Sequence, residues 1–116
     1  MATVYTRRLG GTNAGAVNQF VPMFTVPTGQ TWIVRDFVVT NFSAGPQLLD
    51  VTTRITGDFR FPLWWGTLES NTSYHWDGRA ELIEGEQLTF RAAAGSDSAG
   101  CTVTGYVFDV TTAQPF

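Results

Sequence analysis

The chain has 116 residues, enough for one domain whose folding hides about two-thirds of the surface of the unfolded chain. Its abundance of Thr, Gly, Val and Phe, and its short helix-like segments interrupted by Gly, favour strands joined by turns and argue against a helical fold. The net charge of -3 comes from seven Arg and ten acidic residues spread along the chain, which excludes the basic footprint of a nucleic-acid-binding protein.

The surface is sparsely charged for a domain of this size. A charged fraction of 15%, against roughly 25% in typical domains, indicates that a partner covers part of it. Residues 1–30 lack a positively charged start followed by an apolar stretch of secretory length, and no window approaches 18 apolar residues. We therefore expect synthesis and maturation in a cytoplasm, and no membrane partner.

The first half of the chain predicts an irregular start followed by two strands. Residues 1–18 contain one short strand-like stretch and then Gly, Ala and Asn without periodicity, which predicts an N-terminal arm or a loose first strand. A strand interrupted by Pro22 comes next, and an edge position is expected for it. After a turn at Pro27-Thr28-Gly29, residues 31–41 form the longest predicted strand, with apolar residues on both faces. Such a strand is covered on both sides, by the core and by a neighbour.

The second half predicts four more strands. Residues 48–57 alternate as a half-exposed antiparallel strand does. Residues 59–65 alternate again, and Pro62 implies an edge or a bulge there. A hairpin or tight corner at Glu84-Gly85-Glu86 leads into a strand with Leu88 and Phe90 inward, and residues 102–110 form the last strand.

Seven or eight short strands with turns every 8 to 12 residues are typical of an all-β, antiparallel β-sandwich with a jelly-roll-like arrangement. We expect residues 19–111 to form this domain and residues 112–116 to form a C-terminal tail.

The combinations of residues needed for common catalytic and metal sites are absent from the sequence. The one histidine, His75, lies between Tyr74 and Trp76, and we expect it to be a structural strand residue. Cys101 is the one cysteine and is expected to be a small buried hydrophobe, while Glu84 and Glu86 are expected to be solvated turn residues. We predict no catalytic residue, no metal site and no cofactor, and therefore no enzyme activity.

Aromatic residues are concentrated between residues 59 and 76. Trp64 and Trp65 are adjacent, so they point to opposite faces of an extended strand. Core packing accounts for one of them, as it does for Trp32. For the other, a protein interface, a sugar-stacking platform and ordinary partial burial remain open. The candidate interface residues are Trp64, Trp65 and Trp76.

Three stretches of the sequence, VPTGQTWIVRDFVVTN, SNTSYHWDGRAELIEGEQLTF and CTVTGYVFD, are similar to small β-sandwich proteins encoded among the structural genes of tailed bacteriophages. The shared features are the Pro27-x-Gly29 turn before a strand ending at Asn41, the corner from Gly85 to Leu88, and the Gly105-Tyr106 pair. The likeness covers residues 20–110, and the two ends of the chain depart from it.

The resemblance implies a virion protein, assembled in the host cytoplasm, that decorates or stabilises the capsid as an oligomer, most simply a homotrimer. Its partners are copies of itself and capsid or tail proteins. A minor tail component is an alternative within the same family. The alternative from another class is a carbohydrate-binding module that uses Trp64, Trp65 or Trp76 as a stacking platform.

Overall fold

The computed structural model describes residues 3–15, 18–55, 59–94 and 98–109. This part of the chain contains eight strands and no helix, which confirms the all-β prediction. The strands are β1 (Thr3–Asn13), β2 (Val21–Thr25), β3 (Gln30–Asn41), β4 (Gln47–Ile55), β5 (Phe59–Leu68), β6 (Ser73–Ile83), β7 (Gln87–Ala94) and β8 (Ala99–Asp109).

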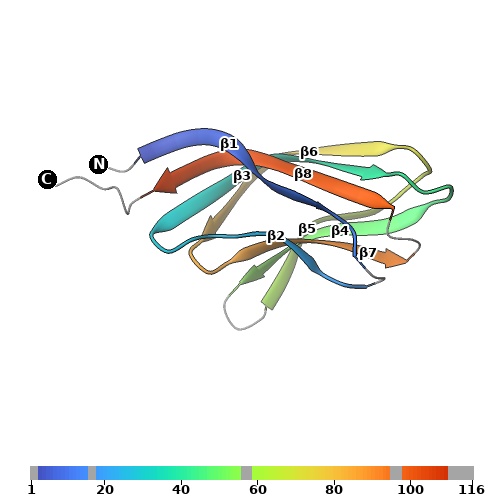
Figure 1. Cartoon of the computed structure of the whole chain (residues 1–116), viewed down its shortest axis with the longest axis horizontal. Helices are drawn as coiled ribbons and strands as arrows, with labels where there is room; N and C mark the ends of the chain where they lie inside the picture. The colour runs from blue at the N-terminus through green and yellow to red at the C-terminus, as the bar shows by residue number, and fades with distance from the viewer. Residues whose placement is uncertain (1–2, 16–17, 56–58, 95–97, 110–116) are drawn as a thin grey trace, which may run out of the picture.

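The strands form two four-stranded antiparallel sheets packed face to face (Figure 1). We call the sheet with order β1-β8-β3-β6 sheet A and the sheet with order β2-β7-β4-β5 sheet B. Apart from β4 and β5, strands that follow one another in the chain lie in opposite sheets. This strand order is that of a jelly roll, so the predicted architecture is confirmed.

The segment 1–18, expected to be an arm or a loose first strand, contains β1, which pairs along its length with β8. The sandwich therefore includes residues from Thr3 onward. The predicted tail, residues 112–116, lies outside the described residues.

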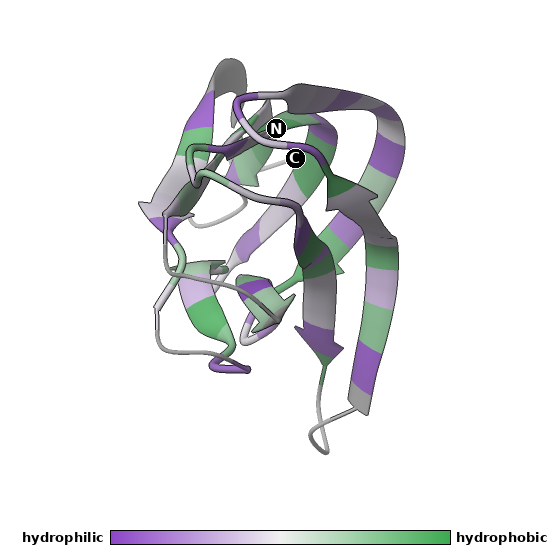
Figure 2. Cartoon of the chain, turned by 90° about the vertical axis from the view of Figure 1, so that its right-hand side faces the viewer, coloured by the Kyte–Doolittle hydropathy of each residue, from purple (hydrophilic) through white to green (hydrophobic). Residues whose placement is uncertain are grey.

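The core lies between the sheets, where alternate residues of each strand meet. Hydrophilic and hydrophobic bands alternate along the strands in Figure 2, as expected for strands with one face on the core. In β7 and β8 the alternation follows the sequence prediction, with Leu88 and Phe90 inward on one and Cys101, Val103 and Val107 inward on the other. The largest fully buried side chains include Phe37, Phe90, Leu49, Leu82 and Leu88.

The interpretation of β3 as a strand with two apolar faces is corrected by a β-bulge. Against β8, Val34 pairs with Gly105 and Asp36 pairs with Thr104, so Arg35 is the extra residue in β3. Against β6, Val34 pairs with Ala80 and Asp36 pairs with Asp77, so there the extra residue lies in β6. A bulge adds one residue to one strand and reverses which face the following side chains take. Val34 before the bulge and Phe37 after it therefore both point into the core, and the outer face of β3 is largely polar.

A bulge also corrects the predicted alternation of residues 59–65. Thr52 pairs with Pro62 and Val51 pairs with Trp64, which leaves Leu63 as the extra residue in β5. The change of phase places Trp64 inward and Trp65 outward. β5 is an edge strand, as Pro62 predicted, and β2 with Pro22 is another.

Two short turns form where the sequence predicted them. Gln30 N donates to the carbonyl of Pro27 at 3.2 Å, and Gly29 has a φ of 78°. At the other turn, Glu86 N donates to the carbonyl of Ile83 at 3.0 Å, and Gly85 has a φ of 84°. Positive φ suits glycine in both places. The second turn is a corner between sheets rather than a hairpin, because β6 and β7 belong to different sheets.

Gly105 permits the closest approach of strands in sheet A. It stands in β8 between β1 and β3, opposite Val34. A Cβ atom on Gly105 would overlap the backbone carbonyl oxygen of Ile33 and would lie 3.0 Å from Leu9 Cδ1. A side chain at this position is incompatible with the pairing of the three strands, since a backbone carbonyl in a ladder cannot move away.

We predict that Gly105→Ala destabilises the protein by more than about 3 kcal/mol or prevents folding, because the ladder between β8 and β3 must separate. Gly45→Ala is the control, since a Cβ there meets nothing within 4 Å. Urea unfolding followed by Trp fluorescence measures both variants. Equal midpoints for the two variants would show that the strands tolerate the extra methyl group.

Candidate functional site

The three candidate interface tryptophans do not form one surface. Trp64 of β5 and Trp76 of β6 are partly buried and pack against the core from the two edge strands on one side of the sandwich. Trp64 stacks on Tyr74 with ring centroids 4.8 Å apart, and Trp76 stacks on Phe37 at the same distance. Both pairs are nearly parallel, at 8°. The Trp64–Tyr74 pair links the edge of sheet B to the edge of sheet A.

Each of these two indoles lies over a glycine two residues further along its strand. A Cβ atom on Gly66 would lie 3.0 Å from Cζ2 of Trp64, and one on Gly78 would lie 2.9 Å from Cζ2 of Trp76. The missing side chains give both rings room to lie against their own strands. The same spacing, tryptophan followed by glycine at the second position, therefore recurs in both edge strands.

Trp65 lies on the outer face of sheet B and is 66% exposed. Its outward orientation confirms that Trp64 and Trp65 point to opposite faces. Trp32 is buried and packs against Phe24 at 4.7 Å between ring centroids, which confirms its place in the core. That Trp65 contacts a partner stays a prediction.

An ion pair between a buried carboxylate and a partly exposed arginine lies next to Trp65. Asp50 of β4 stands opposite Trp65 in the register, on the outer face of the sheet, yet it is only 3% exposed. Nε and Nη2 of Arg91 both donate to Oδ2 of Asp50, at 2.7 and 2.6 Å. Thr52 Oγ1 donates to Oδ1 at 2.8 Å. Charge-assisted bonds to both carboxylate oxygens fix the geometry of this pair and tie β4 to β7.

Phe20 connects the ion pair to the edge strand. Its ring centroid lies 4.4 Å from Cζ of Arg91 and 4.0 Å from Cζ of Arg60, which belongs to β5. Cation–π attraction holds both guanidinium groups against the ring. Phe20, Pro62 and Trp65, with the polar groups around them, enclose a hollow of about 380 Å³. We call it the Trp65 hollow.

The sequence pattern indicates Trp65 but not the other residues that line this hollow. Residues 48–57 were expected to be half exposed, whereas Asp50 and Thr52 on their outer face are buried. The alternating pattern predicts that a polar residue in this strand is exposed to solvent. The residues next to it in the sequence do not indicate that Phe20 and Arg91 cover it. Phe20 and Arg91 are far apart in the sequence, so their contact over β4 could not be predicted from a local pattern.

The remaining candidates lie apart from the Trp65 hollow. His75 of β6 is exposed, and its Nε2 lies 3.8 Å from Oδ1 of Asp36. Glu86 Oε1 accepts a hydrogen bond from the backbone of Ile83 at 2.8 Å, which gives it a role in the corner before β7. Cys101 is 4% exposed, and burial raises the pKa of its thiol to about 12. Its expected role as a small buried hydrophobe is confirmed.

Among the described residues, no three His, Cys, Asp or Glu side chains lie close enough together to share a metal ion. A search of the same residues finds no helix with the length and hydropathy needed to span a membrane.

Comparison with solved structures finds the same fold in virus particles. One match is a chain of the infectious bursal disease virus Gx strain, at 12% identity and a TM-score of 0.53, covering 99% of this chain and 35% of the viral chain. Another is a chain of the T13 particle of that virus, at 13% identity and a TM-score of 0.54, covering 93% and 31%. This chain thus spans about a third of the viral chains it matches.

The globular domain of zebrafish complement 1qA also matches, at 16% identity and a TM-score of 0.45, covering 94% of this chain and 96% of that domain. No protein-family model matches the chain, and no curated protein does. At such low identity, the comparisons with the viral chains establish the β-sandwich fold.

We predict that Trp32→Ala and Trp65→Ala differ sharply in stability. Removing the buried Trp32 should cost roughly 3 to 5 kcal/mol, because it leaves a cavity in the core. Removing the exposed Trp65 should change the free energy of unfolding by no more than about 0.5 kcal/mol. Chemical unfolding measured by far-UV circular dichroism tests both. A large loss of stability in Trp65→Ala would mean that its ring holds the sheet together.

We predict that Cys101 reacts with thiol reagents only after unfolding. With its pKa raised to about 12, the thiol remains protonated at pH 8, and the thiolate is the reactive form. Absorbance after addition of an aromatic disulfide reagent should rise slowly for the native protein and at once in concentrated guanidinium chloride. Rapid labelling of the native protein at pH 8 would show that β8 opens readily.

Proposed function

We propose that this chain is a structural protein of a virus particle and that it works by association rather than by catalysis. The observation that carries the proposal is the Trp65 hollow, where an exposed indole borders an apolar depression on an edge strand of a jelly roll. Tryptophan and arginine are the residues that most often dominate protein interfaces, and both stand here.

The base of the Trp65 hollow is rigid before any partner arrives. The bonds from Arg91 and Thr52 hold Asp50, and Phe20 holds both guanidinium groups. A partner that docks on groups already fixed in place loses less conformational entropy than one that must order them. The depression therefore suits an apolar side chain of another protein, with arginines at its border.

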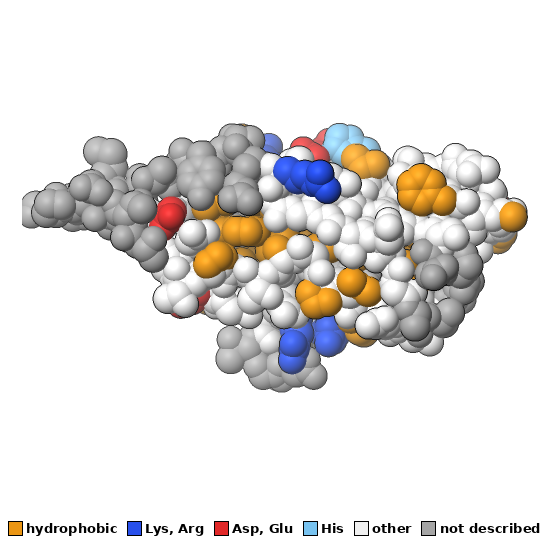
Figure 3. Space-filling model, in the orientation of Figure 1, with side chains coloured by type: hydrophobic (Ala, Val, Ile, Leu, Met, Phe, Trp, Pro, Cys, Tyr) orange, Lys and Arg blue, Asp and Glu red, His pale blue; other side chains and the backbone are white. Residues whose placement is uncertain are grey.

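The rest of the surface supports association. The face of the molecule drawn in Figure 3 has hydrophobic side chains dispersed among uncharged atoms and few charged groups. Exposed apolar residues elsewhere include Phe61 at 56% and Ile83 at 51%. The shared fold with chains of infectious bursal disease virus particles supports the virion setting, although jelly rolls also serve as lectin domains.

Within virions, we favour a tailed bacteriophage and a capsid-decorating homotrimer, on the strength of the sequence resemblance. A minor tail component is the alternative location. A subunit that binds the assembled lattice alone would stabilise it by mass action, by about 2.7 kcal/mol at a concentration one hundred times the dissociation constant. Closed rings would also cover strand edges left open in the monomer.

The carbohydrate-binding alternative keeps one of its three tryptophans as an exposed platform, since Trp64 and Trp76 are partly buried and pack against the core. The Trp65 hollow suits a sugar less well than a protein side chain. Its ion pair is internally satisfied, and Phe20 and Pro62 line much of the rest. A polyol there would find few groups for its hydroxyls.

We predict that the chain forms an oligomer near three times 12.7 kDa at micromolar concentration, and that Trp65→Ala shifts it towards the monomer. Sedimentation velocity measures both. Phe42→Ala is the control, since it removes an equally exposed aromatic ring, and it should leave the association unchanged.

If the wild type sediments as a monomer, binding to purified phage particles followed by cryo-electron microscopy is the deciding measurement. A monomer that binds no particle component would contradict the proposal. Association that is insensitive to Trp65→Ala would contradict the choice of surface.

A further inference from the structure

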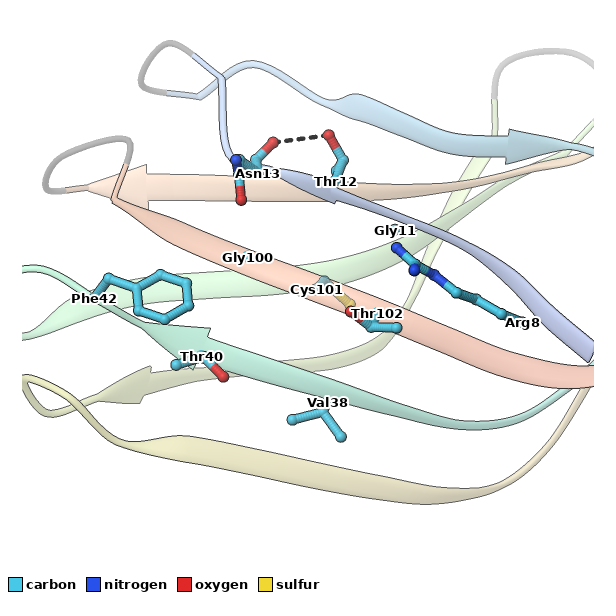
Figure 4. Close-up of a pocket in the computed structure, with 10 residues that line it drawn as sticks. All are labelled: Arg8, Gly11, Thr12, Asn13, Val38, Thr40, Phe42, Gly100, Cys101 and Thr102. Carbon is cyan, nitrogen blue, oxygen red and sulfur yellow. Dashed lines mark hydrogen bonds between the residues drawn. The ribbon is translucent and has the colours of Figure 1, made fainter.

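A second hollow lies on the outer face of sheet A, where β1, β8 and β3 run side by side (Figure 4). The strand register places six residues there in two rows: Asn13, Gly100 and Thr40 in one, and Gly11, Thr102 and Val38 in the other. Each row has one glycine, so the face is hollowed where neighbouring side chains stand up around it. Its volume is about 350 Å³. We call it the Gly100 groove.

An amide and an aromatic ring converge above Gly100. A Cβ atom on Gly100 would lie 3.1 Å from Oδ1 of Asn13 and 3.4 Å from Cε2 of Phe42. Figure 4 shows Phe42 at one end of the groove and Arg8 towards the other, with Asn13 on the β1 side and Thr40 on the β3 side. The absent side chain of Gly100 therefore leaves the space that these groups surround.

The Phe42 ring is exposed but its backbone is held firmly. The ring is 61% exposed, while Phe42 N donates to the carbonyl of Ser98 at 2.8 Å. The preceding residue, Asn41, is fully buried. Its amide nitrogen donates to the carbonyls of Gly45 and Leu68, and its amide oxygen accepts from Gln47. An exposed apolar ring on a fixed backbone is a preformed contact for a ligand.

The polar groups around the groove are hydroxyls, an amide and a guanidinium. Thr40 Oγ1 lies 2.8 Å from Oγ of Ser73, which orients it, and Thr102 is exposed in the floor. Arg8 supplies a planar set of donors, and none of the described residues that line the groove carries a carboxylate. This lining differs from that of the Trp65 hollow, where apolar surface and a closed ion pair predominate.

A pyranose ring has this same combination of chemistry, with C–H groups on its faces and hydroxyls around its edge. We propose that the Gly100 groove binds a pyranose sugar, with one ring face on Phe42 and the hydroxyls at Asn13, Thr40 and Arg8. The volume is at the small end of the range for ligand sites, which fits a single sugar ring. The side chains of Phe42 and Val38 supply the apolar part of the contact.

This site goes beyond the proposed association through Trp65 and does not depend on it. The outer faces of the two sheets point in opposite directions in a sandwich. A subunit docked through sheet B would therefore present sheet A, with the Gly100 groove, away from the surface on which it sits. The two activities are separable by mutation because they share no residue.

The test is a titration of ¹⁵N-labelled protein with glucose, galactose, mannose, N-acetylglucosamine and glucuronic acid, followed by amide chemical shifts. We expect at least one sugar to bind with a dissociation constant in the millimolar range and to shift the amides of Gly100 and Thr102. Phe42→Ala should weaken that binding at least tenfold. Phe61→Ala, which removes an exposed ring from β5, should leave it unchanged.

Gly100→Ala is a second variant that fills the floor. Its new methyl group meets the ends of two side chains most closely, and the backbone oxygen of Thr12 lies at an ordinary contact distance of 3.6 Å. The fold should therefore persist while binding falls at least tenfold. Far-UV circular dichroism checks the fold of each variant. The proposal is overturned if no sugar in the panel shifts the groove amides, or if binding survives both Phe42→Ala and Gly100→Ala. Loss of oligomers in Trp65→Ala with intact sugar binding would separate this site from the association surface.

Discussion

The carboxamide of Asn41 holds together one end of the sandwich. Its nitrogen donates to carbonyl groups in two loops, and its oxygen accepts from Ser43 and from Gln47, all within 3.2 Å. Gln47 in turn donates to the carbonyl of Ser98, before β8. Two connections between strands are therefore bonded directly to one fully buried side chain, and a third is reached through Gln47. Without it, several buried polar groups would lose their partners, which is costly in the low dielectric of a protein interior.

Much of the fold could be predicted because its signals are local. Pro22 and Pro62 indicate edge strands because proline has no backbone N–H to donate to a neighbouring strand. Gly85 indicates a turn because glycine tolerates the positive φ found there, and the alternation of Leu88 and Phe90 indicates an inward face. The bulges at Arg35 and Leu63 could not be predicted in this way. A bulge is defined by the partner strand, and each one reversed the faces assigned to the residues that follow it.

The candidate site was predictable in part for the same reason. Adjacent tryptophans in a strand must diverge, so an outward indole was expected, and Trp65 is that residue. The walls of the Trp65 hollow and the Gly100 groove depend on pairings between distant strands. Gly100 and Asn13 are neighbours because β8 pairs with β1, which the sequence pattern alone does not specify. Topology, rather than composition, brings the residues of the two hollows together.

The two outer faces of the sandwich have different chemical characters. On sheet B, Phe20 and Arg91 cover the outer face of β4, which would otherwise be exposed to solvent, and Trp65 lies beside them. On sheet A, the missing side chains of the glycines leave a depression in the surface between hydroxyl and amide groups. The first face has the chemistry of the proposed protein contact, and the second has the chemistry of the proposed sugar site. The two outer faces can differ in this way because their side chains point away from the core and do not pack in it.

The packing of two tryptophans over glycines limits how these positions can change in evolution. Trp64 covers Gly66, and Trp76 covers Gly78, so any side chain gained at either glycine displaces the ring above it. Loss of either ring would leave its glycine as bare backbone on an edge strand. Each pair is thus free to change only by linked substitutions, and divergent descendants of this chain should keep or lose both members together.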